Sequence, residues 1–119
     1  MGLFSWFSKT TESVDEAIPQ KTECYHIEGF LTCSYFSNAV RIGDMLTHKH
    51  PHIKVDVSAY IKQQWHERSN ELQQEFNTSH RTSPFIYEGC DLENQKVIGG
   101  YTDFAKRVKE TYKLNVPLD

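Results

Sequence analysis

The sequence of 119 residues lacks any apolar run that approaches the roughly 18 residues needed to cross a bilayer. It also lacks an excess of basic residues, because 13 Lys and Arg stand against 16 Asp and Glu and the formal net charge is -3. Nucleic-acid-binding domains usually carry a clustered basic face, so this balance argues against a nucleic-acid partner. Cysteine is scarce as well: three residues are too few and too scattered for a disulfide framework or a four-ligand zinc site. The scarcity of cysteine favours a reducing compartment such as the cytoplasm.

What is present divides the chain into two parts. Residues 1–22 begin with the aromatic stretch "MGLFSWFSK" and continue as a polar segment without a sustained period, which predicts a flexible leader. Residues 23–119 have the length and the hydrophobic content of one folded domain. The apolar side chains within residues 3–7 suit a membrane interface, so a membrane-peripheral location is an alternative to a leader that contacts no membrane.

Hydrophobic periodicity predicts seven elements after the leader. Their order is strand, helix, strand, helix, strand, strand, helix. A strand-helix-strand unit is parallel and a tight hairpin is antiparallel, so we expect an α/β domain with a mixed four-stranded sheet and helices on both faces. The expected positions are a strand over 23–30, a helix ending near residues 48–52, a strand from 53, a helix over about 60–77, a hairpin made by "SPFIYEG" and "QKVIGG", and a last helix with Thr102 as its N-cap.

Cys33 lies where the first strand gives way to the first helix, in "TCSYFSNA". Unpaired N–H groups and the helix dipole favour a thiolate at such a position, so Cys33 is a candidate reactive thiol. The alternative is a small apolar residue that fills a gap in the core. Cys24 on the first strand and Cys90 in the hairpin turn are both expected to lie too far from Cys33 to pair with it. A second thiol would then have to come from solution.

Three stretches resemble the glutaredoxin family, which has the thioredoxin fold. In "TCSYFSNA", Cys33 and Tyr35 match the family's Cys-Pro-Tyr-Cys, but the full motif here reads Cys-Ser-Tyr-Phe, a single-cysteine variant. "RTSPFIYEG" resembles the Arg-Thr-Val-Pro segment, and "VIGGYTDF" resembles the glycine pair with the Ser/Asp-Asp that follows it. The resemblance covers roughly residues 23 to 113.

This resemblance implies a monothiol, glutathione-linked thiol-disulfide oxidoreductase that removes glutathione from glutathionylated proteins. Cys33 would be the catalytic residue. Arg81 would hold one carboxylate of glutathione, the N–H groups around Thr102 and Asp103 the other, and the backbone of Ser83 the middle of the tripeptide. No metal ligand is implied. The glutathione-binding residues that the resemblance implies are Tyr35, Arg81, Thr82, Ser83, Pro84, Gly100, Thr102 and Asp103.

One departure from the family concerns the ligand. Phe30 stands where the family usually has a lysine that contacts glutathione, so we expect weaker glutathione binding or a related low-molecular-weight thiol as the partner.

Two other functions stay open. Some single-cysteine glutaredoxins carry a [2Fe-2S] cluster between two protomers, although those usually have Cys-Gly-Phe-Ser rather than the bulkier sequence found here. A redox-inactive binding module with the same fold is the other alternative. His48, His50 and His52 alternate in "HKHPH", which predicts a polar loop rather than a metal site.

Overall fold

The computed structural model describes residues 21–116. The order of elements in this part of the chain is the predicted one. The elements are β3 (Glu23–Phe30), α1 (Ser34–Lys49), β4 (Ile53–Tyr60), α2 (Lys62–Phe76), β5 (Phe85–Glu88), a short 3-10 helix η2 (Leu92–Asn94), β6 (Lys96–Gly99) and α3 (Tyr101–Tyr112). None of the helices described is long and apolar enough to cross a membrane. The predicted leader, apart from its last two residues, lies outside the described residues.

The strands form one mixed sheet in the order β4-β3-β5-β6. β3 pairs in parallel with β4 along its whole length, from Glu23 opposite Ile53 to Phe30 opposite Tyr60. β5 runs antiparallel to both β3 and β6, with a register shift in the β5–β6 pairing. The prediction of a mixed four-stranded α/β sheet is therefore confirmed.

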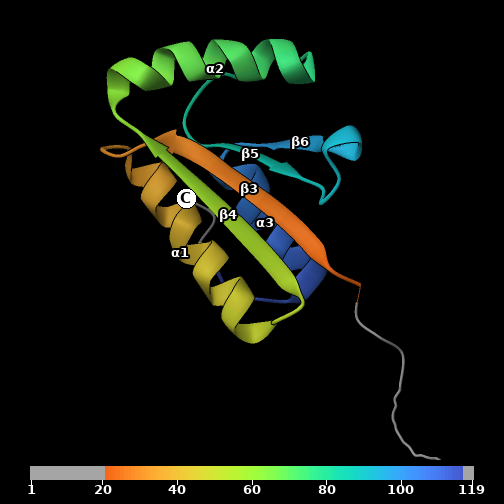
Figure 1. Ribbon diagram of the computed structural model, residues 1–119. Coiled ribbons are helices and arrows are strands. Elements are labelled where there is room, and N and C mark those ends of the chain that lie inside the picture. Colours follow the sequence, from red (N-terminus) through yellow and green to blue (C-terminus); the bar gives the residue numbers. More distant parts are fainter. Residues whose placement is uncertain (1–20, 117–119) are drawn as a thin grey trace, which may run out of the picture.

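The helices cover both faces of the sheet, as Figure 1 shows. α1 and α3 pack together on one face, whereas α2 lies alone on the other. Alternating side chains of β3 divide between the two layers. Tyr25 and Ile27 join the larger core with α1 and α3, while Phe30 packs against the smaller core formed by Trp65, Leu72, Phe85 and Tyr87.

Two helix starts differ from the prediction. α3 begins at Tyr101, with Gly100 rather than Thr102 as its N-cap. The Asp103 carboxylate accepts a hydrogen bond from the Gly100 N–H at 3.2 Å, so an acidic side chain three residues inside the helix takes over the capping role. α2 begins at Lys62 and leaves Ile61 outside the helix and half exposed. A sequence pattern predicts the middle of a helix better than its first residue.

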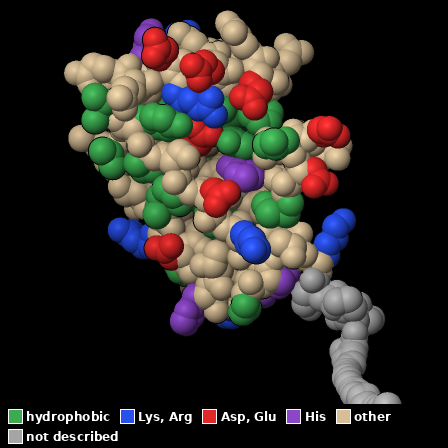
Figure 2. Space-filling model, viewed as in Figure 1, with side chains coloured by type: hydrophobic (Ala, Val, Ile, Leu, Met, Phe, Trp, Pro, Cys, Tyr) green, Lys and Arg blue, Asp and Glu red, His purple; other side chains and the backbone are tan. Residues whose placement is uncertain are grey.

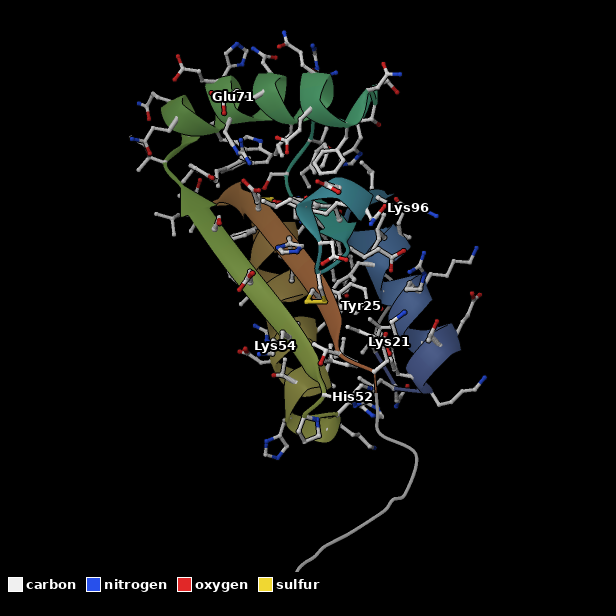
Figure 3. The ribbon with its side chains drawn as sticks, turned by 45° about the vertical axis from the view of Figure 1, so that its right-hand side comes forward. Lys21, Tyr25, His52, Lys54, Glu71 and Lys96 are labelled. Atoms are coloured by element: carbon white, nitrogen blue, oxygen red, sulfur yellow. A yellow bond between two sulfur atoms is a disulfide. The ribbon has the colours of Figure 1, made fainter. Side chains whose placement is uncertain are left out.

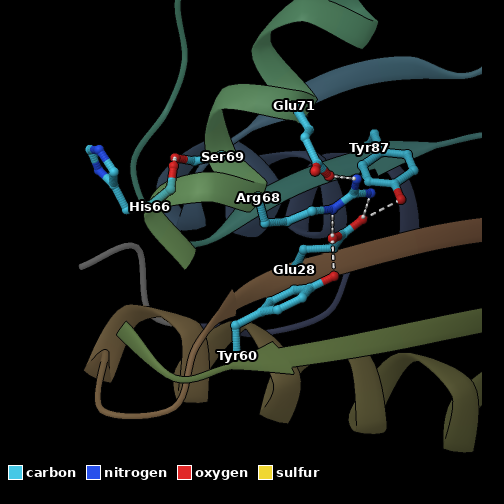
Figure 4. A network of polar contacts seen from close by, with 7 residues as sticks. All are labelled: Glu28, Tyr60, His66, Arg68, Ser69, Glu71 and Tyr87. Carbon is cyan, nitrogen blue, oxygen red and sulfur yellow. Dashed lines mark hydrogen bonds and ion pairs between the residues drawn. The ribbon is translucent and has the colours of Figure 1, made fainter. Parts of the chain in front are cut away.

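A buried carboxylate joins α2 to the sheet (Figure 4). Glu28 of β3 is 3% exposed and accepts hydrogen bonds from Arg68 at 2.8 and 3.0 Å, from Tyr60 at 2.9 Å and from Tyr87 at 2.5 Å. Burial opposes ionisation of Glu28, but these bonds outweigh it and the pKa of Glu28 lies below its ordinary value. Burial, followed by the bond to Glu28, raises the pKa of Tyr87. Glu28 is therefore a charged residue held inside the protein by a cation and two hydroxyl groups.

We expect Arg68→Met to lower the free energy of unfolding by about 2–3 kcal/mol at pH 7, because it leaves the Glu28 charge buried without its cation. The pKa of Glu28 is lowered in the folded state, so this stabilisation is present above its ordinary value of 4.5 and is lost as the pH falls through the folded-state value. Urea unfolding measured from pH 7 downwards should show wild type and variant converging in acid. Glu71→Gln removes only an exposed contact of Arg68 and serves as the control. Equal loss in both variants would contradict the assignment.

A disulfide joins Cys24 of β3 to Cys90 in the turn between β5 and β6, with a Cα–Cα distance of 4.9 Å. Figure 3 shows it as a yellow bond near Tyr25. The sequence predicted no disulfide framework and gave no indication that these two cysteines pair with each other. Pairing of β3 with β5 explains the disulfide, because the Gly89 N–H donates to the Cys24 carbonyl and so carries the next residue, Cys90, to the start of β3.

Candidate functional site

Cys33 is the N-cap of α1, directly after the turn that ends β3. Its N–H donates to the Phe30 carbonyl at 3.1 Å, and its carbonyl accepts the Ser37 N–H at 3.1 Å. Its thiol is half-buried and outside any disulfide. The backbone therefore fixes the sulfur at a helix N-terminus, where access from solvent remains.

The segment before β5 also lies next to Cys33. The Ser83–Pro84 peptide bond is cis. The Cys33 Sγ lies 3.5 Å from the Ser83 carbonyl oxygen, and the Ser83 hydroxyl accepts the Phe30 N–H at 3.1 Å. Cys33 and the Ser83–Pro84 corner, separated by 50 residues in the sequence, are thus within contact distance.

Gly29 makes this approach possible. A Cβ at Gly29 would lie 2.5 Å from both the Phe36 ring and the Ser83 hydroxyl, so any larger residue would push α1 or Ser83 away from the strand. Only glycine leaves room for the segment that contacts Cys33 to lie this close to β3.

A shallow cleft of ≈ 220 Å³ opens beside this contact. It contains most of the residues that the resemblance implied for glutathione. Tyr101 and His80 complete it, and neither was among the residues that the resemblance implied. The lining residues are Tyr35, His80, Thr82, Ser83, Pro84, Gly100, Tyr101, Thr102 and Asp103.

The residues that line the cleft lie close to one another. The His80 ring donates from Nε2 to the Pro84 carbonyl at 3.1 Å, and a Cβ on Gly100 would lie 3.3 Å from the same ring. Across the cleft, the exposed ring of Tyr35 lies 6.0 Å from that of Tyr101. The 80–84 segment therefore lies against the start of α3 along the cleft.

Structural comparison finds a similar fold in known proteins. A solution structure of reduced Escherichia coli glutaredoxin matches with a TM-score of 0.59 and 26% sequence identity, over 76% of this chain and 99% of that one. A second structure of Escherichia coli glutaredoxin matches with a TM-score of 0.55, 26% identity and the same coverage. No family model matches the chain, and neither does any curated protein.

The chain has the glutaredoxin fold. The match supports the glutaredoxin family and, with it, a thiol-disulfide oxidoreductase. The single-cysteine motif and the link to glutathione are finer statements, which we take up below as proposals.

One predicted glutathione residue of this glutaredoxin fold lies elsewhere. Arg81 does not line the cleft beside Cys33; it lines a second cleft of ≈ 190 Å³, on the side of α2. There it shares the lining with Lys62 and Phe30. The sequence did not predict this neighbourhood, because nothing in the order of residues indicates that the start of α2 lies beside the end of β3.

The histidine stretch is only in part the predicted loop. His48 lies in the last turn of α1, His50 follows as its C-cap, and His52 lies 3.6 Å from the Glu23 carboxylate. Within residues 21–116, no group of three or more His, Cys, Asp or Glu side chains is arranged to hold a metal ion. On the face shown in Figure 2, acidic and basic side chains are interspersed rather than gathered into a patch of one sign.

Proposed function

We propose that the chain is a monothiol, glutathione-linked oxidoreductase that reduces mixed disulfides between glutathione and proteins. The observation that carries the proposal is the position of the Cys33 thiol, free at the N-terminus of α1 and 3.5 Å from the Ser83 carbonyl, at the edge of a polar cleft. The glutaredoxin fold adds support. Glutathione, or a related low-molecular-weight thiol, is the proposed partner.

The reaction has two exchange steps. The Cys33 thiolate attacks the glutathione sulfur of a mixed disulfide, a Cys33–glutathione disulfide forms, and the protein thiolate leaves and takes up a proton. The thiolate of a second glutathione then attacks the glutathione sulfur on Cys33, which gives oxidised glutathione and restores the Cys33 thiolate. Over the two steps, the mixed disulfide and one glutathione react to give a reduced protein thiol and oxidised glutathione.

The chain's own cysteines favour a single-thiol route. Cys24 and Cys90 are bonded to each other, and Phe36 occupies the position where a two-cysteine motif would place its second thiol. Phe36 is buried in the core and leaves Cys33 with no partner thiol in its own helix. Release from a mixed disulfide is therefore assigned to free glutathione.

The backbone around Ser83 and the start of α3 supply the proposed binding groups. The peptide of Ser83 is the edge against which the middle of glutathione would pair. The helix start at Thr102 and Asp103 offers N–H groups for a carboxylate and a carboxylate for an ammonium group. We propose that the γ-glutamyl end of glutathione, which has both charges, binds there.

Incubation with oxidised glutathione tests the proposal. We expect one glutathione adduct per chain in the intact mass spectrum, located at Cys33 by peptide mapping without reduction. Cys24 and Cys90 should remain joined in one cross-linked peptide pair and so serve as the internal control. Absence of an adduct, or an adduct on Cys24 or Cys90 alone, would contradict the proposal.

The proposed location is the cytoplasm, with contact between residues 3–7 and a membrane as the alternative. The Cys24–Cys90 disulfide weighs against a strongly reducing compartment, because exposed disulfides are rare where glutathione and thioredoxin keep thiols reduced.

A further inference from the structure

β4 forms one edge of the sheet, and within residues 21–116 no strand lies on its outer side. It has 8 residues, whereas β6 at the opposite edge has 4. Lys54 is labelled beside this strand in Figure 3. An unpaired strand of this length presents a row of backbone donors and acceptors with which another strand can pair. Proteins either guard such an edge or use it as a binding surface.

The outward-facing backbone groups belong to alternate residues of β4. The Tyr60 carbonyl accepts the Leu31 N–H at 2.8 Å and therefore points to the side of β3. The N–H and the carbonyl of a strand residue point to the same side, and this side alternates along the strand. The odd-numbered residues therefore point outwards. The backbone groups of Val55 and Val57 face a side on which the described sheet has no further strand.

Charged and apolar side chains lie on opposite faces of β4. Lys54 and Asp56 share one face, and both are exposed. Lys54 takes part in no ion pair within the part of the chain that the structure describes. The Asp56 side chain is 77% exposed, although the His26 Nδ1 lies 3.4 Å from its carboxylate. On the other face Val57 is 45% exposed, so the strand offers both kinds of side chain to a partner.

The spacing of the two charges selects one pairing of β4 with a second copy of itself. Only outward-facing residues can exchange hydrogen bonds, so in an antiparallel pair odd-numbered residues lie opposite odd-numbered ones. A pairing centred on Val55 places Lys54 of each copy opposite Asp56 of the other. A shift of two positions places Lys54 opposite Lys54 in one direction and Asp56 opposite Asp56 in the other. Opposite charges across strands stabilise a pair and like charges destabilise it, so the register centred on Val55 is favoured.

The backbone and the apolar side chains fit the same register. Val55 lies opposite the partner's Val55, and the exposed Val57 lies opposite the partner's Ile53. The Val55 N–H would donate to the partner's Val55 carbonyl, and the Val57 N–H to the partner's Ile53 carbonyl. The Ile53 N–H already donates to the His50 carbonyl at 2.9 Å, so the pairing ends at Ile53.

We infer that two copies of this chain associate through β4, antiparallel and centred on Val55, and so join their two sheets into one. The interface is isologous, because each copy contributes the same stretch, residues 53–57, and the symmetry closes at two copies. Such a small interface implies weak association, with a dissociation constant of the order of 100 µM.

This association leaves the two reactive-thiol candidates apart. Tyr60, whose carbonyl bonds to the turn before Cys33, lies near the end of β4 and away from the centre of the pairing. At the rise of a strand, the two copies of Tyr60 would lie about 30–35 Å from each other. Each Cys33 then keeps its own cleft, and no cluster could be shared between the two thiols. The inference is therefore independent of the proposed function.

Sedimentation equilibrium of the full chain over a concentration series tests the pairing, in a Cys33→Ser background that excludes dimers joined through Cys33. The protein should shift from monomer to dimer. Lys54→Asp and Asp56→Lys should each raise the dissociation constant at least about tenfold, because each substitution acts twice and replaces attraction by repulsion. The two substitutions change the net charge in opposite directions, so a general charge effect cannot weaken both. Lys96→Asp makes the first change on the opposite edge and should have no effect.

Recombination of the charges tests the register more strictly. Lys54→Asp/Asp56→Lys in one chain reverses both charges and should restore the dissociation constant to within about threefold of the parent value. An equal mixture of the Lys54→Asp protein with the Asp56→Lys protein should form heterodimers, because every cross-strand pair is then attractive. Circular dichroism and thermal unfolding check that each variant is folded. Single variants that dimerise as the parent does would place the interface elsewhere and overturn the inference.

Hydrogen exchange identifies what covers the edge. The Val55 and Val57 amides should become more protected as the protein concentration rises, and Lys54→Asp should abolish this gain. Equal protection at every concentration would mean that a segment of the same chain pairs with β4. Absence of protection at every concentration would mean that the edge faces only water and that Lys54 and Asp56 serve to guard it. Either result overturns the inference.

Discussion

Cys33→Ser is expected to reduce glutathione-dependent turnover of a mixed disulfide by at least about a hundredfold, to the rate of the uncatalysed exchange. A serine hydroxyl cannot form the disulfide intermediate, although it fills nearly the same volume and should leave the fold intact. The assay is reduction of a glutathione–cysteamine mixed disulfide, coupled to NADPH through glutathione reductase. Circular dichroism and thermal unfolding check that the variant is folded.

The double variant Cys24→Ser/Cys90→Ser is the matched control. It makes the same chemical change at the two other cysteines and leaves Cys33 as the only sulfur available for exchange. Below its unfolding temperature, this variant should turn over at a rate close to that of wild type. Loss of activity in the folded double variant, with an active Cys33→Ser, would reverse the assignment and make the disulfide the redox centre.

Breaking the Cys24–Cys90 disulfide is expected to lower the free energy of unfolding by about 4 kcal/mol. The two residues are separated by 66 positions, so the bond closes a long loop in the unfolded chain and removes much of its conformational freedom. In a domain of this size, such a loss corresponds to a decrease of about 15–30 °C in the unfolding temperature.

Urea unfolding of the Cys33→Ser protein, with and without a reductant, measures this effect without interference from the reactive thiol. The oxidised protein should unfold at the higher urea concentration, and Cys24→Ser/Cys90→Ser should behave like the reduced protein whether or not reductant is present. The disulfide would be contradicted by a thiol titration that finds three free thiols in native wild type under air.

The sheet and the placement of Cys33 were predictable because they follow from local patterns. Alternation along residues 23–30 and the helical spacing after Cys33 each define one element, and a strand-helix-strand unit leaves little choice of pairing. Cys33 then falls at a helix start without any knowledge of the tertiary structure. The contact between Cys33 and Ser83 required only the resemblance of the second motif.

Tertiary contacts that depend on the register between strands were harder to predict. The disulfide depends on which residue of β5 faces which residue of β3: Tyr25 lies opposite Glu88, and a shift of two residues would have separated Cys24 from Cys90. Periodicity defines the two strands but says nothing about their alignment.

The division between two clefts of the residues expected to bind glutathione was also not predictable. Thr82 and Arg81 are neighbours in the sequence, yet they line different clefts, and the chain bends at Thr82. Lys62 lies 32 positions after Phe30, and only the packing of α2 over the end of β3 brings them together. A motif search treats such residues as unrelated.

The covalent ring closed by Cys24 and Cys90 contains α1, β4, α2 and β5, and so Cys33 as well. A protease that cuts the chain once between α2 and β5 would therefore release nothing. The two pieces would migrate together on a denaturing gel and separate only after dithiothreitol is added. The proposed function of the protein is itself disulfide exchange. Whether the two fragments stay joined after such a cut would depend on the ratio of reduced to oxidised thiols around the protein.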